Sequence, residues 1–229
     1  MADAEQSKRT AAQYAIDYVE DGISVGLGTG STVKYFIEEL AKSKLKVRCI
    51  PTSLETEKLA RKLKLNVISL AEGIKPSKIG GPPLIDVCVD GADEVDKRFN
   101  LIKGGGGALL REKIVASASL QYIVIVDESK LVPKLGAFPL PVEVLPFAQP
   151  YIEFELRELE ANPVLRKGFT TDNGNIILDV AGLDFGDPLQ LETELNNIPG
   201  ILENGIFAVR QPEVVVVGKG KDVKVLENE

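Results

Sequence analysis

Carboxylates, hydroxyls and glycines gather in short polar segments that each follow an apolar run of this 229-residue chain. GLGTGST occupies positions 26–32, DGADEVD positions 90–96 and DESK positions 127–130. A fourth segment, KGGGGALLREK at 103–113, comes a few residues after DGADEVD. Open α/β folds bind ligands at the edge where the carboxyl ends of parallel strands meet, so we expect the four segments to converge there.

The glycine-rich segment at 26–32 predicts a phosphate site at the start of a helix. Glycines let backbone N–H groups approach an anion, and the helix N-terminus adds partial positive charge. Thr29, Ser31 and Thr32 add hydroxyl donors around Gly30. A dinucleotide-binding motif would have glycine at position 31 and an acidic residue after the next strand, and this chain has neither. A purely structural tight turn and a nicotinamide site remain the alternatives.

The acidic segment DGADEVD holds four carboxylates in seven residues. Asp90 follows an apolar run directly and should lie partly buried at the edge of the sheet, and Asp93 can face the same way if the segment turns. A phosphorylated substrate beside two carboxylates needs a compensating cation, for which Lys103 is the nearest candidate and Lys130 the second. The alternative is a solvated acidic turn.

The four glycines after Lys103 disfavour regular structure and would expose backbone N–H groups to a ligand. Glu112 lies on the helix that follows, where its position between Arg111 and Lys113 would by itself favour an exposed surface residue. The chain has no histidine, so a carboxylate must act if this site transfers protons near neutral pH. That absence makes Glu112 a candidate base.

The composition excludes several kinds of site. Without histidine there is no Ser-His-Asp triad and no histidine-ligated metal, which leaves only a cation with oxygen ligands, such as Mg²⁺. Cys49 and Cys88 lie in strand-like runs and are interpreted as buried, with a thiol nucleophile as the alternative.

Charge and hydropathy exclude two classes of partner. A net charge of −7 argues against a nucleic-acid surface, which needs clustered lysine and arginine. The apolar runs are too short to span a bilayer, and the first ten residues lack the apolar segment of a signal peptide. We therefore expect a cytoplasmic protein without membrane or nucleic-acid partners.

Strand-like and helix-like patterns alternate over the first 130 residues, which predicts a parallel sheet with helices on both faces. We expect strands at 23–27, 46–50, 66–70, 84–89 and 121–126 and helices at 6–20, 31–42, 52–63 and 108–118. Thr52 and Glu55 are spaced as a capping box, and a Gly/Pro-rich connection runs through Pro83.

The rhythm changes at residue 138 and predicts the β-α-β-β-α-β order of a ferredoxin-like domain. Its expected strands are 139–145, 164–171, 175–180 and 206–210, with helices at 150–160 and 188–197 and a tight turn at 172–174. The run at 213–217 returns to the first sheet. The predicted fold is therefore α/β, with a Rossmann-like doubly wound parallel sheet at 1–131 plus 211–229 and an inserted ferredoxin-like α+β domain at 132–210.

GTGST, DGADEVD, KGGGGALLREK and TDNGNIILDV, in this order and with these gaps, resemble the ribose-5-phosphate isomerase A family from Lys8 to about Gly218. The resemblance implies interconversion of ribose 5-phosphate and ribulose 5-phosphate in the non-oxidative pentose phosphate pathway, without metal or cofactor. It matches the family's general base to Glu112. The substrate contacts that it implies are Thr29, Gly30, Ser31, Thr32, Asp90, Gly91, Ala92, Asp93, Lys103, Gly104, Gly105, Gly106 and Lys130, with Lys8 as a further phosphate contact.

One carboxylate can serve both carbons of such an isomerisation, because the proton leaves C2 and returns to C1 through an enediolate. Burial raises the basicity of a glutamate, and Leu109, Ile114 and Val115 are the apolar neighbours expected to bury Glu112. Lys103 and the N–H groups of the glycine run would offset the enediolate charge.

Asp90 is the candidate for the proton transfers of ring opening and Asp93 for holding the sugar hydroxyls. A non-catalytic sugar-phosphate sensor on the same scaffold and a nucleotide- or coenzyme-A-linked transferase are the rival functions. The resemblance and the small inserted domain predict a homodimer or homotetramer.

Overall fold

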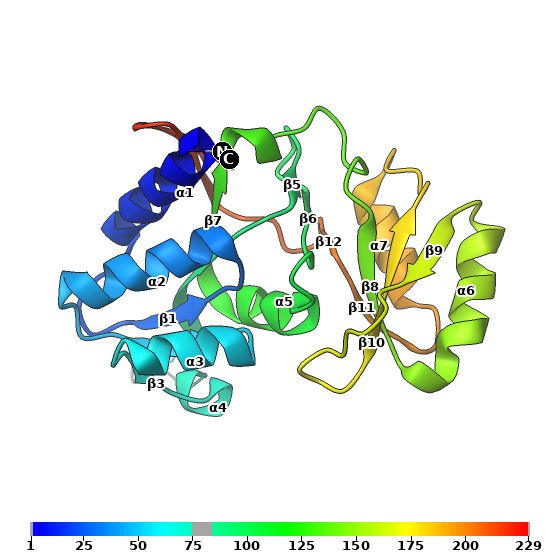
Figure 1. Cartoon of the computed structure of the whole chain (residues 1–229), viewed down its shortest axis with the longest axis horizontal. Helices are drawn as coiled ribbons and strands as arrows, with labels where there is room; N and C mark the ends of the chain where they lie inside the picture. The colour runs from blue at the N-terminus through cyan, green and yellow to red at the C-terminus, as the bar shows by residue number, and fades with distance from the viewer. Residues whose placement is uncertain (1, 75–83, 229) are drawn as a thin grey trace. The chain divides into compact units, whose positions relative to one another are not determined.

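The computed structural model describes residues 2–74 and 84–228 (Figure 1). The chain forms two compact units. The first unit comprises Met1–Gly91, Arg111–Ser129 and Pro212–Glu229, and the second comprises Ala92–Leu110 and Lys130–Gln211. The chain therefore passes from one unit to the other inside DGADEVD and again inside KGGGGALLREK. The predicted connection through Pro83 lies outside the described residues.

The first unit is built on a seven-stranded sheet in the order β14-β13-β7-β4-β1-β2-β3. All neighbours are parallel except β14, which runs antiparallel to β13. The six parallel strands, numbered along the chain, have the 3-2-1-4-5-6 order of the Rossmann fold, which confirms the predicted fold class. The strands are β1 (Ser24–Leu27), β2 (Arg48–Pro51), β3 (Asn66–Val67), β4 (Ile85–Asp90), β7 (Ser119–Asp127), β13 (Val214–Lys219) and β14 (Asp222–Glu227).

Helices cover both faces of this sheet. Val25 and Leu27 of β1 face a buried core that includes Phe36 of α2, and α1 and α2 lie side by side over it (Figure 1). Gly26 faces the opposite way, where an added Cβ would lie 2.6 Å from Val115 Cγ1 of α5. The helices are α1 (Ala2–Tyr14), the 3₁₀ turn η1 (Ala15–Tyr18), α2 (Ser31–Ser43), α3 (Leu54–Lys62), α4 (Leu70–Gly73) and α5 (Leu109–Ser117).

The second unit contains an antiparallel sheet in the order β11-β8-β10-β9. Its elements follow the predicted β-α-β-β-α-β order, and α6 and α7 pack on the face of β8 that carries Leu140, Val142 and Val144. The ferredoxin-like prediction is confirmed. The elements are β8 (Leu140–Val144), the 3₁₀ turn η3 (Pro146–Ala148), α6 (Gln149–Glu158), β9 (Asn162–Leu165), β10 (Ile176–Ala181), α7 (Pro188–Asn196) and β11 (Ile201–Asn204).

A small three-stranded sheet, β12-β6-β5, completes the second unit. It joins β5 (Glu94–Val95), β6 (Leu101–Ile102) and β12 (Ile206–Phe207). The strand predicted at 206–210 was therefore wrong as the fourth strand of the ferredoxin-like sheet, because β11 takes that place. The predicted second domain began at 132, whereas the compact unit also includes Ala92–Leu110.

The capping box predicted at Thr52 and Glu55 was also wrong. Helix α3 begins at Leu54, and the N-cap is Ser53, whose Oγ accepts the Thr56 N–H at 3.1 Å. Ser53 takes the cap because Pro51 still belongs to β2 and the Thr52 hydroxyl is hydrogen-bonded to that of Thr29 at 2.8 Å. A capping box does occur at Ser69 and Glu72, before α4.

Candidate active site

Asp90 and the glycine-rich loop meet between β1 and β4, where the strand order of the sheet reverses. Asp90 is fully buried, and its Oδ1 accepts the N–H groups of Thr29 at 3.1 Å and Gly91 at 2.7 Å. An added Cβ at Gly28 would lie 2.0 Å from this same oxygen. Position 28 must therefore be glycine for the carboxylate to reach the loop, and the reversal point is where such sheets bind ligands.

The hydroxyl of Thr29 ties this loop to hydroxyl groups at the start of α3. Its Oγ1 lies 2.8 Å from the hydroxyls of Thr52 and Ser53 and 3.3 Å from that of Thr56. The Thr56 hydroxyl also donates to the Gly28 carbonyl at 2.8 Å. The Thr29 side chain is thus committed to hydrogen bonds within the protein, which leaves Ser31 and Thr32 as the hydroxyls at the start of α2.

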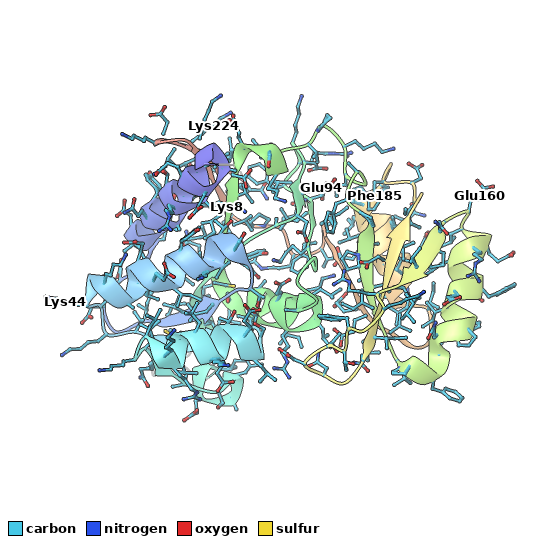
Figure 2. All side chains as sticks on the ribbon, in the orientation of Figure 1. Lys8, Lys44, Glu94, Glu160, Phe185 and Lys224 are labelled. Carbon is cyan, nitrogen blue, oxygen red and sulfur yellow. The ribbon has the colours of Figure 1, made fainter. Side chains whose placement is uncertain are left out.

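Lys8 reaches the start of α2. Its Nζ donates to Ser31 Oγ at 2.9 Å, and Figure 2 shows Lys8 on α1. Gly30 precedes the helix with a φ of 124°, a conformation that favours glycine. An ammonium group, a hydroxyl and the free N–H groups of a helix N-terminus together form a suitable receptor for a phosphate group.

A pocket of about 660 Å³ opens beside this helix start, lined by Thr29, Gly30 and Ser31 and by residues of α2 and α3. Lys34, Lys58 and Lys62 are among its lining residues. Against these three lysines the lining has one carboxylate, Glu55, so basic side chains outnumber acidic ones here in a chain whose net charge is −7.

Glu112 is buried, with only 3% of its surface exposed. It lies on the face of α5 that also carries Val115 and Ala116, which are 3% and 0% exposed. The expected shielding by Leu109 and Val115 fits, because both are buried, but Ile114 is 43% exposed and does not contribute. Residues three and four positions apart share a helix face, which excludes Ile114 from the face of Glu112.

In the second unit, the DGADEVD segment divides into residues with different tasks. Asp93 Oδ2 accepts the Gly105 N–H at 2.8 Å. Glu94, labelled in Figure 2, is 3% exposed and accepts the N–H groups of Gly136 and Phe138 at 2.7 and 2.6 Å. Asp96 Oδ1 accepts two N–H groups of the following turn, at 2.8 and 2.9 Å. Glu94 and Asp96 are structural, and Asp93 belongs with the glycine run.

Lys103 is 2% exposed and carries a charge into the interior of the second unit. Its N–H donates to the Gly205 carbonyl at 2.9 Å, and its Nζ lies 5.5 Å from the centre of the Phe207 ring. A cation over an aromatic ring is attracted by the negative face of the ring. The following residues, Gly105 and Gly106, are exposed.

Three more of the predicted site residues lie in half-buried connections between elements. Gly91 and Ala92 are half-buried and join β4 to β5, and Lys130 is half-buried at the end of the 3₁₀ turn Glu128–Lys130. Cys49 and Cys88 are both buried, and burial raises the pKa of the Cys49 thiol to about 12, which disfavours the thiolate that a nucleophile needs. In the described part of the chain, no three His, Cys, Asp or Glu residues are placed to hold a metal.

Residues 48–222 match the family model of ribose 5-phosphate isomerase A (phosphoriboisomerase A). Ribose-5-phosphate isomerase A of Acidithiobacillus ferrooxidans is 49% identical over 217 residues, which cover 94% of this chain and 95% of that protein. The chain belongs to the ribose 5-phosphate isomerase A family.

Two solved structures extend this relation to the fold. Ribose 5-phosphate isomerase A from Neisseria gonorrhoeae is 42% identical and superposes with a TM-score of 0.94 over 100% of this chain and 99% of its own. A D-ribose-5-phosphate isomerase in complex with phospho-erythronic acid is also 42% identical, with a TM-score of 0.89 over 98% of this chain and 99% of its own. Among the described residues, no helix is long and apolar enough to cross a membrane.

Sequence reasoning missed two groups of residues in this family member. Thr52, Ser53 and Thr56 support the glycine-rich loop through their hydroxyls, but only Thr52 was given a role from the sequence, as a helix cap. Arg166 contacts the glycine run at 104–105. It was missed because the predicted strand at 164–171 continued through it, whereas β9 ends at Leu165.

Proposed function

We propose that this chain interconverts D-ribose 5-phosphate and D-ribulose 5-phosphate through an enediolate, with the Glu112 carboxylate as the base. The isomerase activity follows from membership of the family. One observation supports the role of Glu112: in a chain without histidine, this acidic residue is only 3% exposed, within the segment that follows the glycine run.

The proposed proton path uses Glu112 twice. The carboxylate takes the proton from C2 of the open-chain aldose, and the electron pair of the broken C–H bond forms the enediolate. The protonated Glu112 then returns the proton to C1, while the hydroxyl proton at O2 is transferred to O1 as the C2 carbonyl forms, which gives the ketose. A buried carboxylate suits this task, because restricted access of water lets many turnovers return the same proton to C1 before it exchanges with solvent.

Lys103 and the N–H groups of the glycine run are proposed to stabilise the enediolate. Lys103 is 2% exposed, and a buried positive charge interacts more strongly with a developing oxyanion than an exposed one does. Asp90 is proposed for the proton transfers of ring opening. Asp93, held by the Gly105 N–H, is proposed to hold the sugar hydroxyls.

Lys8, Ser31, Thr32 and Lys130 are proposed to bind the phosphate, together with the N–H groups at the start of α2. The contact between Lys8 Nζ and Ser31 Oγ supports this assignment for two of them. The complex of a relative with phospho-erythronic acid, a phosphorylated four-carbon acid, fits a substrate of this class. Remote phosphate binding would hold C1 and C2 in place for the base.

The direct test is the isomerisation of ribose 5-phosphate in D₂O, followed by NMR of the C2 and C1 hydrogens. We expect turnover together with deuterium incorporation, because the base exchanges its proton with solvent during part of the turnovers. Binding of ribose 5-phosphate without turnover would instead support the sugar-phosphate sensor.

The proposed steps use no metal, so activity should survive exhaustive EDTA treatment. Assembly as a homodimer or homotetramer in the cytoplasm also remains part of this proposal.

A further inference from the structure

The glycine run after Lys103 has a fixed shape. The Gly107 N–H donates to the Gly104 carbonyl at 2.9 Å and closes a turn. Gly104 and Gly107 have φ values of 98° and 77°, and an added Cβ at Gly107 would lie 2.2 Å from Phe169 Cζ. An added Cβ at Gly105 would lie 2.7 Å from Asp93 Oδ1. The run is therefore a packed turn and not a flexible linker.

Arg166, just after β9, forms hydrogen bonds with the carbonyl groups of this turn. Its Nη1 donates to the carbonyl oxygens of Gly104 and Gly105, each at 3.2 Å. The rest of the guanidinium is held by Asp179 of β10, with Nε 2.9 Å from Oδ2 and Nη2 bonded to Oδ1. The two side chains are 19% and 28% exposed, so the pair is largely shielded from water.

Because each peptide group is planar, the hydrogen bonds to these carbonyls also orient the N–H groups on the opposite side of the turn. In a trans peptide the N–H points away from the preceding carbonyl, so fixing two carbonyls fixes the N–H groups of Gly105 and Gly106. The Gly105 N–H points to Asp93 Oδ2 at 2.8 Å. Within the described chain the Gly106 N–H makes no hydrogen bond, and Gly106 is exposed.

We propose that Arg166 is a positioning residue for the isomerisation. Through the carbonyls of Gly104 and Gly105, it aims the Gly106 N–H at the enediolate oxygen and keeps Asp93 on the Gly105 N–H. This inference rests on the proposed function, because it concerns an N–H donor of that same site. Asp179 supports it in turn by holding the guanidinium.

Lysine could not replace arginine here. The planar guanidinium uses three nitrogens to reach a carboxylate and two carbonyls at once, whereas an ammonium has one nitrogen on a flexible stem. The Arg166 Cζ also lies 5.4 Å from the centre of the Phe169 ring, whose edge fills the space beside Gly107. Arginine thus links the two contacts that shape the turn.

The test compares Arg166→Met and Arg166→Lys with Arg157→Met, which removes an exposed arginine paired with Glu153 on α6. For Arg166→Met we expect kcat to fall about 10- to 100-fold, somewhat less than the loss of an oxyanion donor itself, with KM changed less than about threefold. Arg166→Lys should fall between wild type and Arg166→Met, and Arg157→Met should match wild type.

A second measurement separates positioning from general loss of structure. Phospho-erythronic acid carries a carboxylate where the enediolate charge develops, and erythritol 4-phosphate carries a neutral hydroxyl there. Arg166→Met should weaken binding of the acid by about the same factor as kcat and leave the alcohol within about twofold. Equal weakening of both ligands, or a kcat like that of Arg157→Met, would overturn the inference.

The outcomes also separate this inference from the proposed function. A wild-type chain that does not isomerise ribose 5-phosphate contradicts the proposed function itself. An active wild type with unchanged Arg166 variants contradicts only the role of Arg166. If Arg166→Met does not fold, as judged by circular dichroism, Arg166→Gln and Asp179→Asn decide the question by the same two measurements.

Discussion

The Nζ of Lys8 lies 2.9 Å from the Oγ of Ser31, so a lysine of the first helix meets the first residue of α2. If both groups bind the substrate phosphate, Lys8→Met removes one charged hydrogen bond from binding and leaves the chemistry at C1 and C2 intact. Hydrogen bonds to charged groups are worth about 1.5–3 kcal/mol, so KM should rise at least about 10-fold with kcat little changed.

Steady-state kinetics at two salt concentrations check this prediction. Lys46→Met, which removes an exposed lysine from the same unit, is the matched control and should behave like wild type. The KM difference between wild type and Lys8→Met should shrink as salt screens the ammonium. An unchanged KM in Lys8→Met would place the phosphate elsewhere.

Glu112→Gln keeps the shape of the buried side chain and removes the base. We expect kcat to fall by about 10²–10⁴, the usual range for general-base catalysis, with little change in KM. Exchange of the C2 hydrogen in D₂O should fall in parallel. Glu112→Asp, which keeps a carboxylate on a shorter side chain, should retain more activity than Glu112→Gln, and turnover of Glu112→Gln near that of wild type would remove Glu112 from the mechanism.

Gly28→Ala tests the close approach of the loop to Asp90. Its Cβ would lie 2.0 Å from Asp90 Oδ1, so the carboxylate or the loop must move. We expect a loss of about 1–3 kcal/mol in the free energy of unfolding, as for other overpacked sites, together with a lower kcat.

Gly22→Ala is the control for backbone strain alone, because Gly22 has a φ of +86° and no atom within 4 Å of the added Cβ. It should cost about 1–2 kcal/mol from the left-handed conformation and leave kcat unchanged. Chemical denaturation and kinetics on both variants give the comparison. Equal kcat values in the two variants would show that Asp90 tolerates displacement.

The strands that carry the glycine-rich loop and Asp90 could be predicted because they are buried on both faces and read as continuous apolar runs. The strand at 213–217 was placed correctly for the same reason. The strands β5, β6 and β12 have two residues each, too few to show any period. The sequence therefore could not show that residues 92–110 pack with the second unit.

The chemistry of the candidate site could be predicted only in part. The sequence showed four carboxylates in DGADEVD but could not separate Glu94 and Asp96, which hold backbone N–H groups, from Asp90 and Asp93. That separation depends on loops distant in sequence, since the partners of Glu94 are Gly136 and Phe138. The contacts of Arg166 also depend on distant residues, because its acceptors lie more than sixty positions away.

Burial of Cys49 predicts a pH dependence of stability with a definite sign. The pKa of its thiol is raised from 9.0 to about 12 in the folded chain. Between these pH values the unfolded chain releases the thiol proton and the folded chain keeps it, so unfolding becomes more favourable. The free energy of unfolding should therefore not depend on ionisation of the Cys49 thiol below pH 9. From there toward pH 12 it should fall by about 1.4 kcal/mol per pH unit because of this thiol.

The measurement is urea unfolding of wild type and Cys49→Val between pH 8 and 11. Other groups titrate alike in both proteins, so the difference in the free energy of unfolding isolates the thiol. Wild type should lose stability faster than the variant above pH 9, and parallel curves would contradict the burial effect. Because both cysteines are buried, neither should react with a thiol reagent at pH 8 until the chain unfolds.

The hydrogen bonds of Glu143 indicate that the TDNGN segment at 171–175 has a structural role. The side chain is fully buried, and its Oε1 accepts hydrogen bonds from Thr171 Oγ1 at 2.9 Å, Asn173 Nδ2 at 3.0 Å and Asn175 Nδ2 at 2.8 Å. Its Oε2 is buried without a hydrogen-bond partner. One oxygen therefore joins three side chains of a turn that also closes on itself through the Thr171 N–H to Asn175 carbonyl hydrogen bond.

Two variants of Glu143 separate the acceptor from the charge. Glu143→Gln keeps the accepting oxygen and should lower the free energy of unfolding by less than about 1–2 kcal/mol. Glu143→Leu leaves the buried donors of Thr171 and Asn175 unsatisfied and should cost at least about 2 kcal/mol, at about 1–3 kcal/mol for each buried group. Denaturation of both variants checks this order, and an equal cost for the two would mean that the charge of Glu143, and not its hydrogen bonds, holds the turn.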